Sequence, residues 1–103
     1  MSTKILVAEA RARFNHAESK LYLREKYTNK LNISHAGGMW FINIELINFL
    51  RESSSGEATE ILVDKFNNPI EVDRKEFLEL ATRIYNDNMA EWLREYNELS
   101  KKR

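Results

Sequence analysis

The chain has 103 residues, with sixteen basic and sixteen acidic side chains, 43% apolar residues, one proline and no cysteine. This length predicts a single domain, and the lack of cysteine excludes disulfides and thiolate metal sites. The balanced charge argues against the strong basic excess of nucleic-acid and membrane-surface proteins. No apolar run approaches the roughly 20 residues that span a bilayer, and the N-terminus lacks the apolar core of a signal peptide. We therefore expect a cytoplasmic protein.

Residues 3 to about 32 are predicted to form one long helix. Strong helix formers dominate this stretch, and three alanines near its start permit close approach of a partner helix. Arg24 and Thr28 interrupt the main apolar row, and Leu23 and Tyr27 on the neighbouring row are expected to replace it. Because such a helix is about 45 Å long, it needs an equally long neighbour. The main row consists of Val7, Ala10, Phe14, Ala17 and Leu21.

The neighbour is predicted near the other end of the chain, over residues 74 to about 100. Asp73 and Glu76 have the spacing of a capping box. An apolar row with spacings of three or four then continues without a break for about 40 Å. The connection allows either orientation, but antiparallel pairing is favoured for neighbouring helices in a compact fold. The row consists of Leu78, Ala81, Tyr85, Met89, Trp92, Tyr96 and Leu99.

Between these helices the sequence predicts a helix end, a short apolar run and a second helix. The segment over residues 32–38 is expected to end the first helix, and its two glycines can take positive φ at no steric cost. Residues 39–42 are predicted to be an extended segment that packs against the helices. Asn43 can cap a short helix over residues 44 to about 52, and a polar loop over residues 53–56 follows it.

A β-hairpin is predicted over residues 60–72. Asp64 suits the first position of a type I turn, and Asn67 tolerates the left-handed conformation that ends such a loop. Pro69 donates no ladder hydrogen bond, so it begins a strand or lies on an edge. A lone ribbon is marginal in water and should dock on the helices or pair with a ribbon from another subunit. The predicted fold class is α+β, mainly α, with two long antiparallel helices, a short middle helix and a β-hairpin.

The charges are distributed unevenly along the chain. Residues 1–35 carry a net charge of +4 and residues 36–103 a net charge of −4. The simpler interpretation is that complementary faces attract each other within one fold. The alternative is a basic strip on the first helix that contacts the phosphates of an external nucleic acid. The residues that would make those contacts are Arg11, Arg13, Lys20, Arg24 and Lys30.

The residue types that carry catalysis or bind metals do not occur in a recognisable pattern. Arg13 occupies the position at which His16 would need a glutamate in a carboxylate-bridged metal bundle. His35 precedes a glycine pair, but the pattern of a phosphate-binding loop is absent. The serines at positions 53–55 lack the glycines of a nucleophile elbow. The sequence therefore predicts a protein that is not an enzyme and needs no cofactor or metal.

Large aromatic side chains are the candidates for contact with a protein partner. Packing inside the core and between the helices is the simpler interpretation of these rings. A small domain has limited room to cover them, however, and aromatic anchors are enriched in interface hot spots. The candidate partner-binding residues are Trp40, Phe41, Phe66, Trp92 and Tyr96.

Two parts of the sequence resemble uncharacterised small proteins of large tailed bacteriophages. One is the segment from Asp64 to Arg74 together with the later string Trp92-Leu93-Arg94-Glu95-Tyr96, and the other runs from Lys20 through Trp40. The resemblance covers most of the chain. It implies a viral accessory or assembly role in the cytoplasm of a bacterial host and assigns no functional residue.

The expected function is a non-enzymatic protein-interaction module that associates with itself and with a host or virion protein. The alternative is a regulator associated with nucleic acid or the transcription machinery through the basic first helix. Because each long helix buries only one stripe, we expect a twofold dimer with four long helices around one core. That core would contain Phe14, Leu21, Leu78, Tyr85, Met89 and Trp92.

Overall fold

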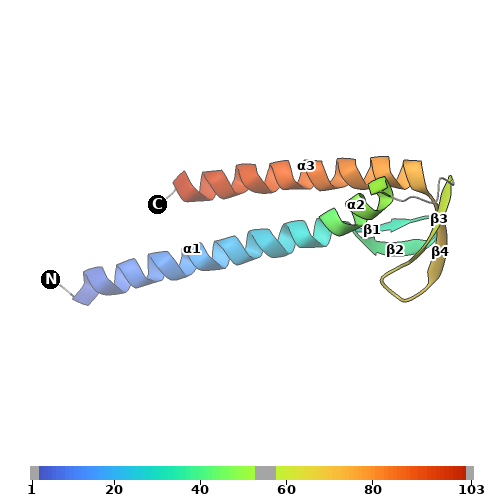
Figure 1. The fold of residues 1–103 in the computed structure, drawn as a ribbon. Helices are drawn as coiled ribbons and strands as arrows, with labels where there is room; N and C mark the ends of the chain where they lie inside the picture. The colour runs from blue at the N-terminus through green and yellow to red at the C-terminus, as the bar shows by residue number, and fades with distance from the viewer. Residues whose placement is uncertain (1–2, 53–57, 102–103) are drawn as a thin grey trace.

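The computed structural model describes residues 3–52 and 58–101, with side chains from residue 15 onward. Within these residues, three helices and two antiparallel hairpins follow one another along the chain (Figure 1). The fold class is α+β and mainly α, as predicted. The loop predicted at residues 53–56 lies outside the described residues. The elements are α1 (Thr3–Lys30), β1 (Asn32–His35), β2 (Gly38–Phe41), α2 (Ile44–Glu52), β3 (Thr59–Val63), β4 (Pro69–Asp73) and α3 (Arg74–Lys101).

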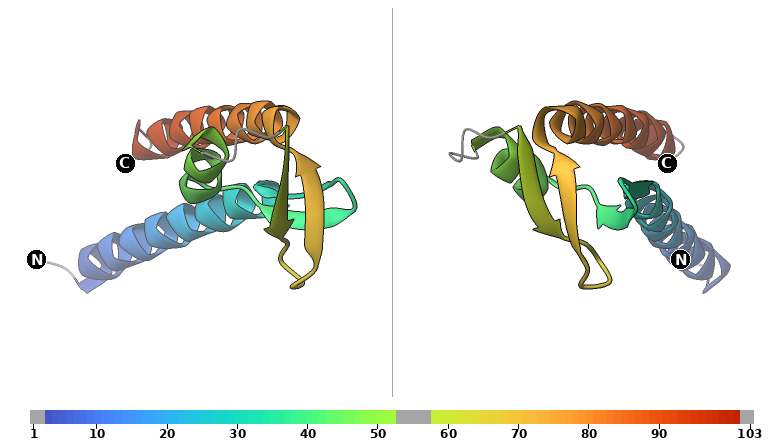
Figure 2. Two further views of the ribbon diagram at one scale, coloured as in Figure 1. Left: turned by 45° about the vertical axis from the view of Figure 1, so that its right-hand side comes forward. Right: turned by 90° about the vertical axis from the view of Figure 1, so that its right-hand side faces the viewer.

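The two long helices have equal length and run in opposite directions. α1 and α3 contain 28 residues each, which corresponds to about 42 Å. Both chain termini therefore lie at the same end of the molecule, and the helices diverge toward that end (Figures 1 and 2). α1 ends slightly before its predicted limit because Asn32 belongs to β1, and its Nδ2 donates to the carbonyl of Thr28 at 3.3 Å. The antiparallel pair predicted from the sequence is confirmed.

Residues 32–41 form a hairpin that the sequence did not predict: α1 ends before this segment and Gly37 takes the expected positive φ, but the segment is a pair of strands with a turn rather than a helix end alone. β1 pairs with β2 in a register that places Ile33 opposite Trp40. The two turn residues, Ala36 and Gly37, have φ values of 53° and 84°. Positive φ at both central positions is the requirement of a type I′ turn, which connects strands of a tight hairpin. A Cβ at Gly38 would lie 3.1 Å from Ile70 and Trp40, so the second glycine permits close packing of the hairpin.

The core lies at one end of the molecule, where the first turns of α3 meet α2 and both hairpins. Phe77 is fully buried and stacks on His35, with the ring centroids 4.8 Å apart. The Trp40 ring contacts Phe77 at 5.2 Å, and its Nε1 donates to the His35 carbonyl at 2.9 Å. Several rings thus share one site and anchor β1 and β2 to α3. The buried cluster comprises Leu31, Trp40, Ile42, Ile47, Leu50, Val72, Phe77 and Ala81.

The predicted helix caps and the predicted second hairpin are present. Asn43 accepts the backbone N–H of Leu46 at 2.8 Å and begins α2. Asp73 accepts the N–H of Glu76 at 2.9 Å and begins α3. The turn between β3 and β4 contains Asn67 with a φ of 64°. These features require only neighbouring residues, which is why they could be predicted from local sequence.

The molecule is far more extended than a compact domain of the same length. Its radius of gyration is 19.7 Å, whereas a compact domain of this length has about 13 Å. Its dimensions are 69 × 24 × 18 Å. Because the core occupies one end, the distal half of α3 packs mainly against the C-terminal half of α1.

Candidate protein-interaction surface

One carboxylate connects the two hairpins. Asp64 is only 6% exposed, and its Oδ2 accepts the backbone N–H of Met39 in β2 at 3.0 Å. Its Oδ1 accepts the N–H groups of Phe66 and Asn68 at 3.0 and 2.9 Å. The N–H of Lys65 donates to the Met39 carbonyl at 2.8 Å and completes the connection. The turn of the second hairpin is therefore fixed to the first hairpin by backbone groups and one side chain.

These hydrogen bonds also determine the ionisation of Asp64. The N–H of Met39, followed by that of Asn68, lowers the pKa of this carboxyl from its ordinary value. Burial acts in the opposite direction and is outweighed. Asp64 is thus a carboxylate held in its charged form by backbone donors, and its role is structural.

A stacked aromatic pair holds α1 against α3. Tyr27 of α1 is buried, and its ring is nearly parallel to that of Trp92 of α3, with the centroids 6.0 Å apart. The ammonium groups of Lys26 and Lys30 lie 5.2 and 5.0 Å from the centroid of the Tyr27 ring. Cations over a tyrosine face are attracted by its electron-rich ring. This contact fixes the lateral position of the two helices.

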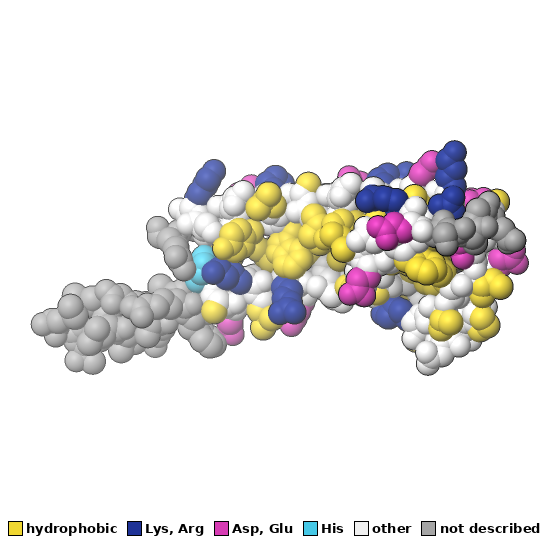
Figure 3. All heavy atoms as spheres, viewed as in Figure 1, with side chains coloured by type: hydrophobic (Ala, Val, Ile, Leu, Met, Phe, Trp, Pro, Cys, Tyr) yellow, Lys and Arg dark blue, Asp and Glu magenta, His cyan; other side chains and the backbone are white. Residues whose placement is uncertain are grey.

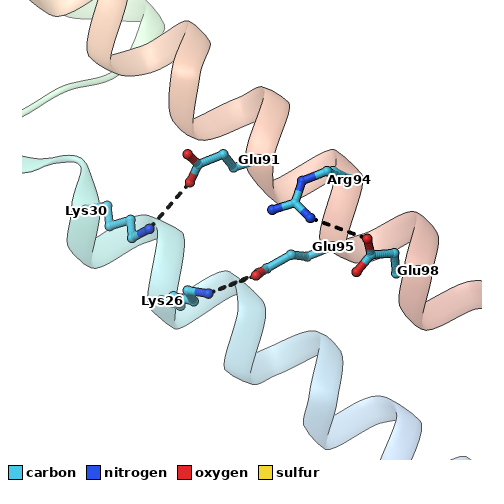
Figure 4. A network of polar contacts seen from close by, with 6 residues as sticks. All are labelled: Lys26, Lys30, Glu91, Arg94, Glu95 and Glu98. Atoms are coloured by element: carbon cyan, nitrogen blue, oxygen red, sulfur yellow. Dashed lines mark hydrogen bonds and ion pairs between the residues drawn. The ribbon is translucent and has the colours of Figure 1, made fainter.

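Ion pairs between the helices set their register. The Lys26 Nζ lies 3.0 Å from Glu95 Oε1, and the Lys30 Nζ lies 3.5 Å from Glu91 Oε2 (Figure 4). A further pair within α3 joins Arg94 and Glu98 at 3.3 Å. The two interhelical pairs join basic residues of α1 to acidic residues of α3, as the uneven charge distribution predicted.

The pKa values of this contact follow from its geometry. The hydrogen bond from Lys26 lowers the pKa of Glu95, and the Tyr27 hydroxyl, which also bonds to Glu95, lowers it further. The same carboxylate raises the pKa of Lys26 above its ordinary value. Burial, followed by the bond to Glu95, raises the pKa of Tyr27. All three groups therefore keep their usual ionisation states at neutral pH.

The predicted partner-binding aromatic residues occupy different environments. Trp40 is 4% exposed and belongs to the core, so its ring has almost no exposed surface with which to contact a partner, contrary to the prediction. Trp92 is half-buried against Tyr27. Phe41, Phe66 and Tyr96 are exposed. The structure thus leaves three rings available, and they lie at the hairpins and at the distal end of α3.

Two of the basic residues of the alternative hypothesis contact α3. Lys30 is paired with Glu91, and Lys20 lies 5.8 Å from the centroid of the Tyr96 ring. Arg24 is exposed. The side chains of Arg11 and Arg13 lie outside the described residues. Part of the positive charge of α1 is therefore used to hold α3.

The β3 side of the outer face of the second hairpin, together with its turn, exposes apolar side chains. The strands β3 and β4 alternate, with Leu62, Ile70 and Val72 toward the core and the intervening residues toward solvent. Ile61 and Val63 are 71% and 64% exposed, and Phe66 at the turn is 67% exposed. Figure 3 shows hydrophobic side chains at the surface here and along the seam between α1 and α3. The exposure of Ile61 and Val63 was not predictable, because the run from Ile61 to Val63 is uniformly apolar and does not reveal which face is buried.

The register of the ion pairs leaves part of α1 without α3 beside it. Lys26 and Lys30 lie opposite Glu95 and Glu91, so Lys101, the last residue of α3, lies opposite residue 20 of α1. Residues 3–18, which we call the α1 overhang, extend past α3 by about 24 Å. Figure 1 shows α1 continuing beyond the C-terminal end of α3.

No known protein family, curated protein or solved structure matches this chain. Among the helices of the described residues, none combines the length and the hydropathy needed to cross a membrane. The same residues hold no cluster of three or more His, Cys, Asp or Glu side chains suited to a metal ion. The candidate site therefore rests on the surfaces themselves, namely the α1 overhang with the distal half of α3, and the outer side of the β3–β4 hairpin.

Proposed function

We propose that this chain is a non-enzymatic protein-interaction module that self-associates through the α1 overhang and the distal half of α3. The observation that carries the proposal is the overhang itself. Helical stability in proteins comes mainly from packing of an apolar stripe, and in the register set by the ion pairs the helix over residues 3–18 extends past Lys101, the last described residue of α3. The sequence of this stretch includes Ile5, Leu6, Val7 and Phe14, and apolar residues of this kind are normally the buried stripe of a helix.

A second copy of the chain is the partner that matches this surface in length. A twofold axis would place two overhangs side by side and antiparallel, so that each reaches the end of α3 in the other copy. The alanines in the first turns of α1 favour such a close approach. Exposed apolar side chains flank the region on both helices, with Leu21 and Tyr22 on α1 and Leu93 and Tyr96 on α3. The sequence resemblance suggests the assembly of a tailed bacteriophage as the biological setting.

Light scattering coupled to size-exclusion chromatography tests the proposal. Across a concentration series through the micromolar range, the expected mass is twice the chain mass of 12.2 kDa. Leu93→Glu introduces a charge into each half of a twofold interface and should weaken association about a hundredfold. Phe49→Glu is the matched control, because Phe49 is 49% exposed on α2, at the other end of the molecule, against 59% for Leu93.

Two outcomes would refute this function. A monomeric mass at the highest concentration would show that the overhang has no second copy on it. An equal loss of association in both variants would show that the surface lies elsewhere. Circular dichroism of both variants checks that any change in mass does not arise from unfolding.

A further inference from the structure

The two edges of the β3–β4 hairpin differ in what they offer to another strand. The register pairs Thr59 with Asp73, Ile61 with Glu71 and Val63 with Pro69. At the two ends of the ladder, the backbone N–H of Asp64 donates to the Asn68 carbonyl and the backbone N–H of Arg74 donates to the Ala58 carbonyl. In an antiparallel ladder, hydrogen-bonded and non-hydrogen-bonded pairs alternate. The hydrogen-bonded pairs are therefore those of even-numbered residues in both strands. The backbone N–H and C=O groups of odd-numbered residues point away from the opposite strand of the hairpin.

The β4 edge is closed to strand pairing. Its outward positions are Pro69, which has no N–H, and Glu71 and Asp73, which are charged. Proline and charge are the devices by which edge strands avoid pairing with other chains. Asp73 is additionally engaged at the start of α3.

The β3 edge carries none of these devices. Its outward backbone groups belong to Thr59, Ile61 and Val63, and within the described residues the groups of Ile61 and Val63 form no hydrogen bond. The side chains of these two residues are exposed and β-branched. Figure 2 shows β3 as the outermost strand of the two hairpins. An open apolar edge of this kind is a template for another strand.

A depression lies beside this open edge. Its volume is about 260 Å³, and its lining includes Phe41 of β2, Leu46 of α2, and Leu62 and Val63 of β3. A strand added to β3 would place alternate side chains over this depression and the remaining ones on the outer face. The depression therefore favours apolar residues at alternate positions of the incoming strand.

The charge of the sheet distinguishes between occupants. The strands β3 and β4 contain the acidic residues Glu60, Glu71 and Asp73 and no basic residue. A second copy of β3 would bring the same negative charge to the edge. A strand with basic residues on its outer face would instead lie across β3 from Glu71 and Asp73, two strand spacings or about 10 Å away, and long basic side chains would be attracted to these carboxylates.

We infer that the open edge of β3 binds an extended segment of a partner protein by strand addition, and that this segment has alternating apolar residues and flanking basic residues. This inference rests on the proposed interaction role and names the chemistry of the partner. Main-chain hydrogen bonds supply the affinity in this mode of recognition, and the depression and the acidic residues supply the specificity.

The probe is the synthetic peptide Lys-Val-Thr-Val-Thr-Val-Lys with blocked termini, measured by fluorescence anisotropy and by amide chemical shifts. In the expected pose the valines lie over the depression, and the threonines bond to the β3 backbone. N-methylation of the threonines should therefore weaken binding about tenfold, while N-methylation of the valines should leave it unchanged. Amide shifts should be largest at Ile61 and Val63.

Two protein variants distinguish strand pairing at the β3 edge from non-specific hydrophobic binding. Val63→Pro removes an outward N–H without removing a bond to β4, and it should weaken the peptide about tenfold. Val63→Thr keeps the N–H and the branched side chain and should bind like the wild type. Glu71→Lys should reverse the preference between this peptide and one with glutamate in place of lysine.

Equal binding by the wild type and Val63→Pro, or equal effects of both N-methylated peptides, would overturn the inference. It would also be overturned if no peptide binds and Val63→Pro lowers the solution mass measured by light scattering. In that case the β3 edge pairs with a second copy of this chain. The peptide should bind the monomeric Leu93→Glu variant as well as the wild type. A monomeric wild type that still binds the peptide would refute the helical surface alone.

Discussion

Replacement of Phe77 by alanine tests whether the hairpin and the long helices share one core. The ring is fully buried and contacts both His35 and Trp40 of the first hairpin. Truncation of a buried phenylalanine costs about 4 kcal/mol through lost transfer energy and the cavity left behind. The free energy of unfolding of a domain this size is about 5–15 kcal/mol, so Phe77→Ala removes a large share of it. With the typical unfolding entropy for 103 residues, the melting temperature should fall by about 18 °C.

Urea unfolding followed by circular dichroism measures this loss, at one protein concentration because self-association adds to stability. Phe66→Ala is the matched control, since that ring is exposed at the hairpin turn and its removal should change the free energy of unfolding by less than about 0.5 kcal/mol. A loss below about 1 kcal/mol for Phe77→Ala would refute the reasoning. So would equal losses in the two variants.

Three further changes test individual contacts. Ala36→Asn should raise the free energy of unfolding by about 1 kcal/mol, measured by urea unfolding, because an Asn-Gly pair suits the type I′ turn better than an alanine with positive φ. The pKa of Asp64 is lowered in the folded state, so its contribution to stability is present above its unfolded pKa of about 3.9 and is lost as pH falls. The free energy of unfolding of Asp64→Asn should therefore depend less on pH in the acid range than that of the wild type, measured by urea unfolding. Because burial raises the pKa of Tyr27, its contribution is present below its unfolded pKa of about 10 and is lost at higher pH. In an ultraviolet titration the raised pKa of Tyr27 should give a component that ionises above about pH 10, and Tyr27→Phe should remove that component.

Several elements were predictable because their causes are local. The cap at Asn43, the cap at Asp73 and the turn from Asp64 to Asn67 each depend on groups within a few residues of one another. The length of α3 follows from an unbroken row of apolar residues. None of these features needs information about a distant part of the chain.

The first hairpin was missed because its signals are ambiguous in the sequence. A glycine pair after a helix also ends helices, and the strands beside it have only four residues each. What selects the hairpin is the packing of Trp40 and His35 on Phe77, more than 35 positions further along the chain. The close approach of Gly38 to Ile70 is likewise a contact between distant residues.

The candidate surface was predicted in part. Phe66 and Tyr96 are exposed as expected, whereas Trp40 is buried by the first hairpin. The open edge of β3 could not be predicted, because the parity of the hydrogen-bond ladder decides which backbone groups point outward. That parity was fixed only when the register with β4 was known.

The sequence by itself determined two long helices, a short one and a ribbon, because periodicity and capping act over one or two turns. The tertiary structure decided which row of α1 contacts α3. Leu21 of the longer apolar row is 54% exposed, while Tyr27 of the neighbouring row is buried against Trp92. Both rows are compatible with a helix, and only the position of the stacked rings and the pairs with Glu91 and Glu95 distinguishes them. Those contacts join residues more than 60 positions apart, and their geometry exists only in the folded chain.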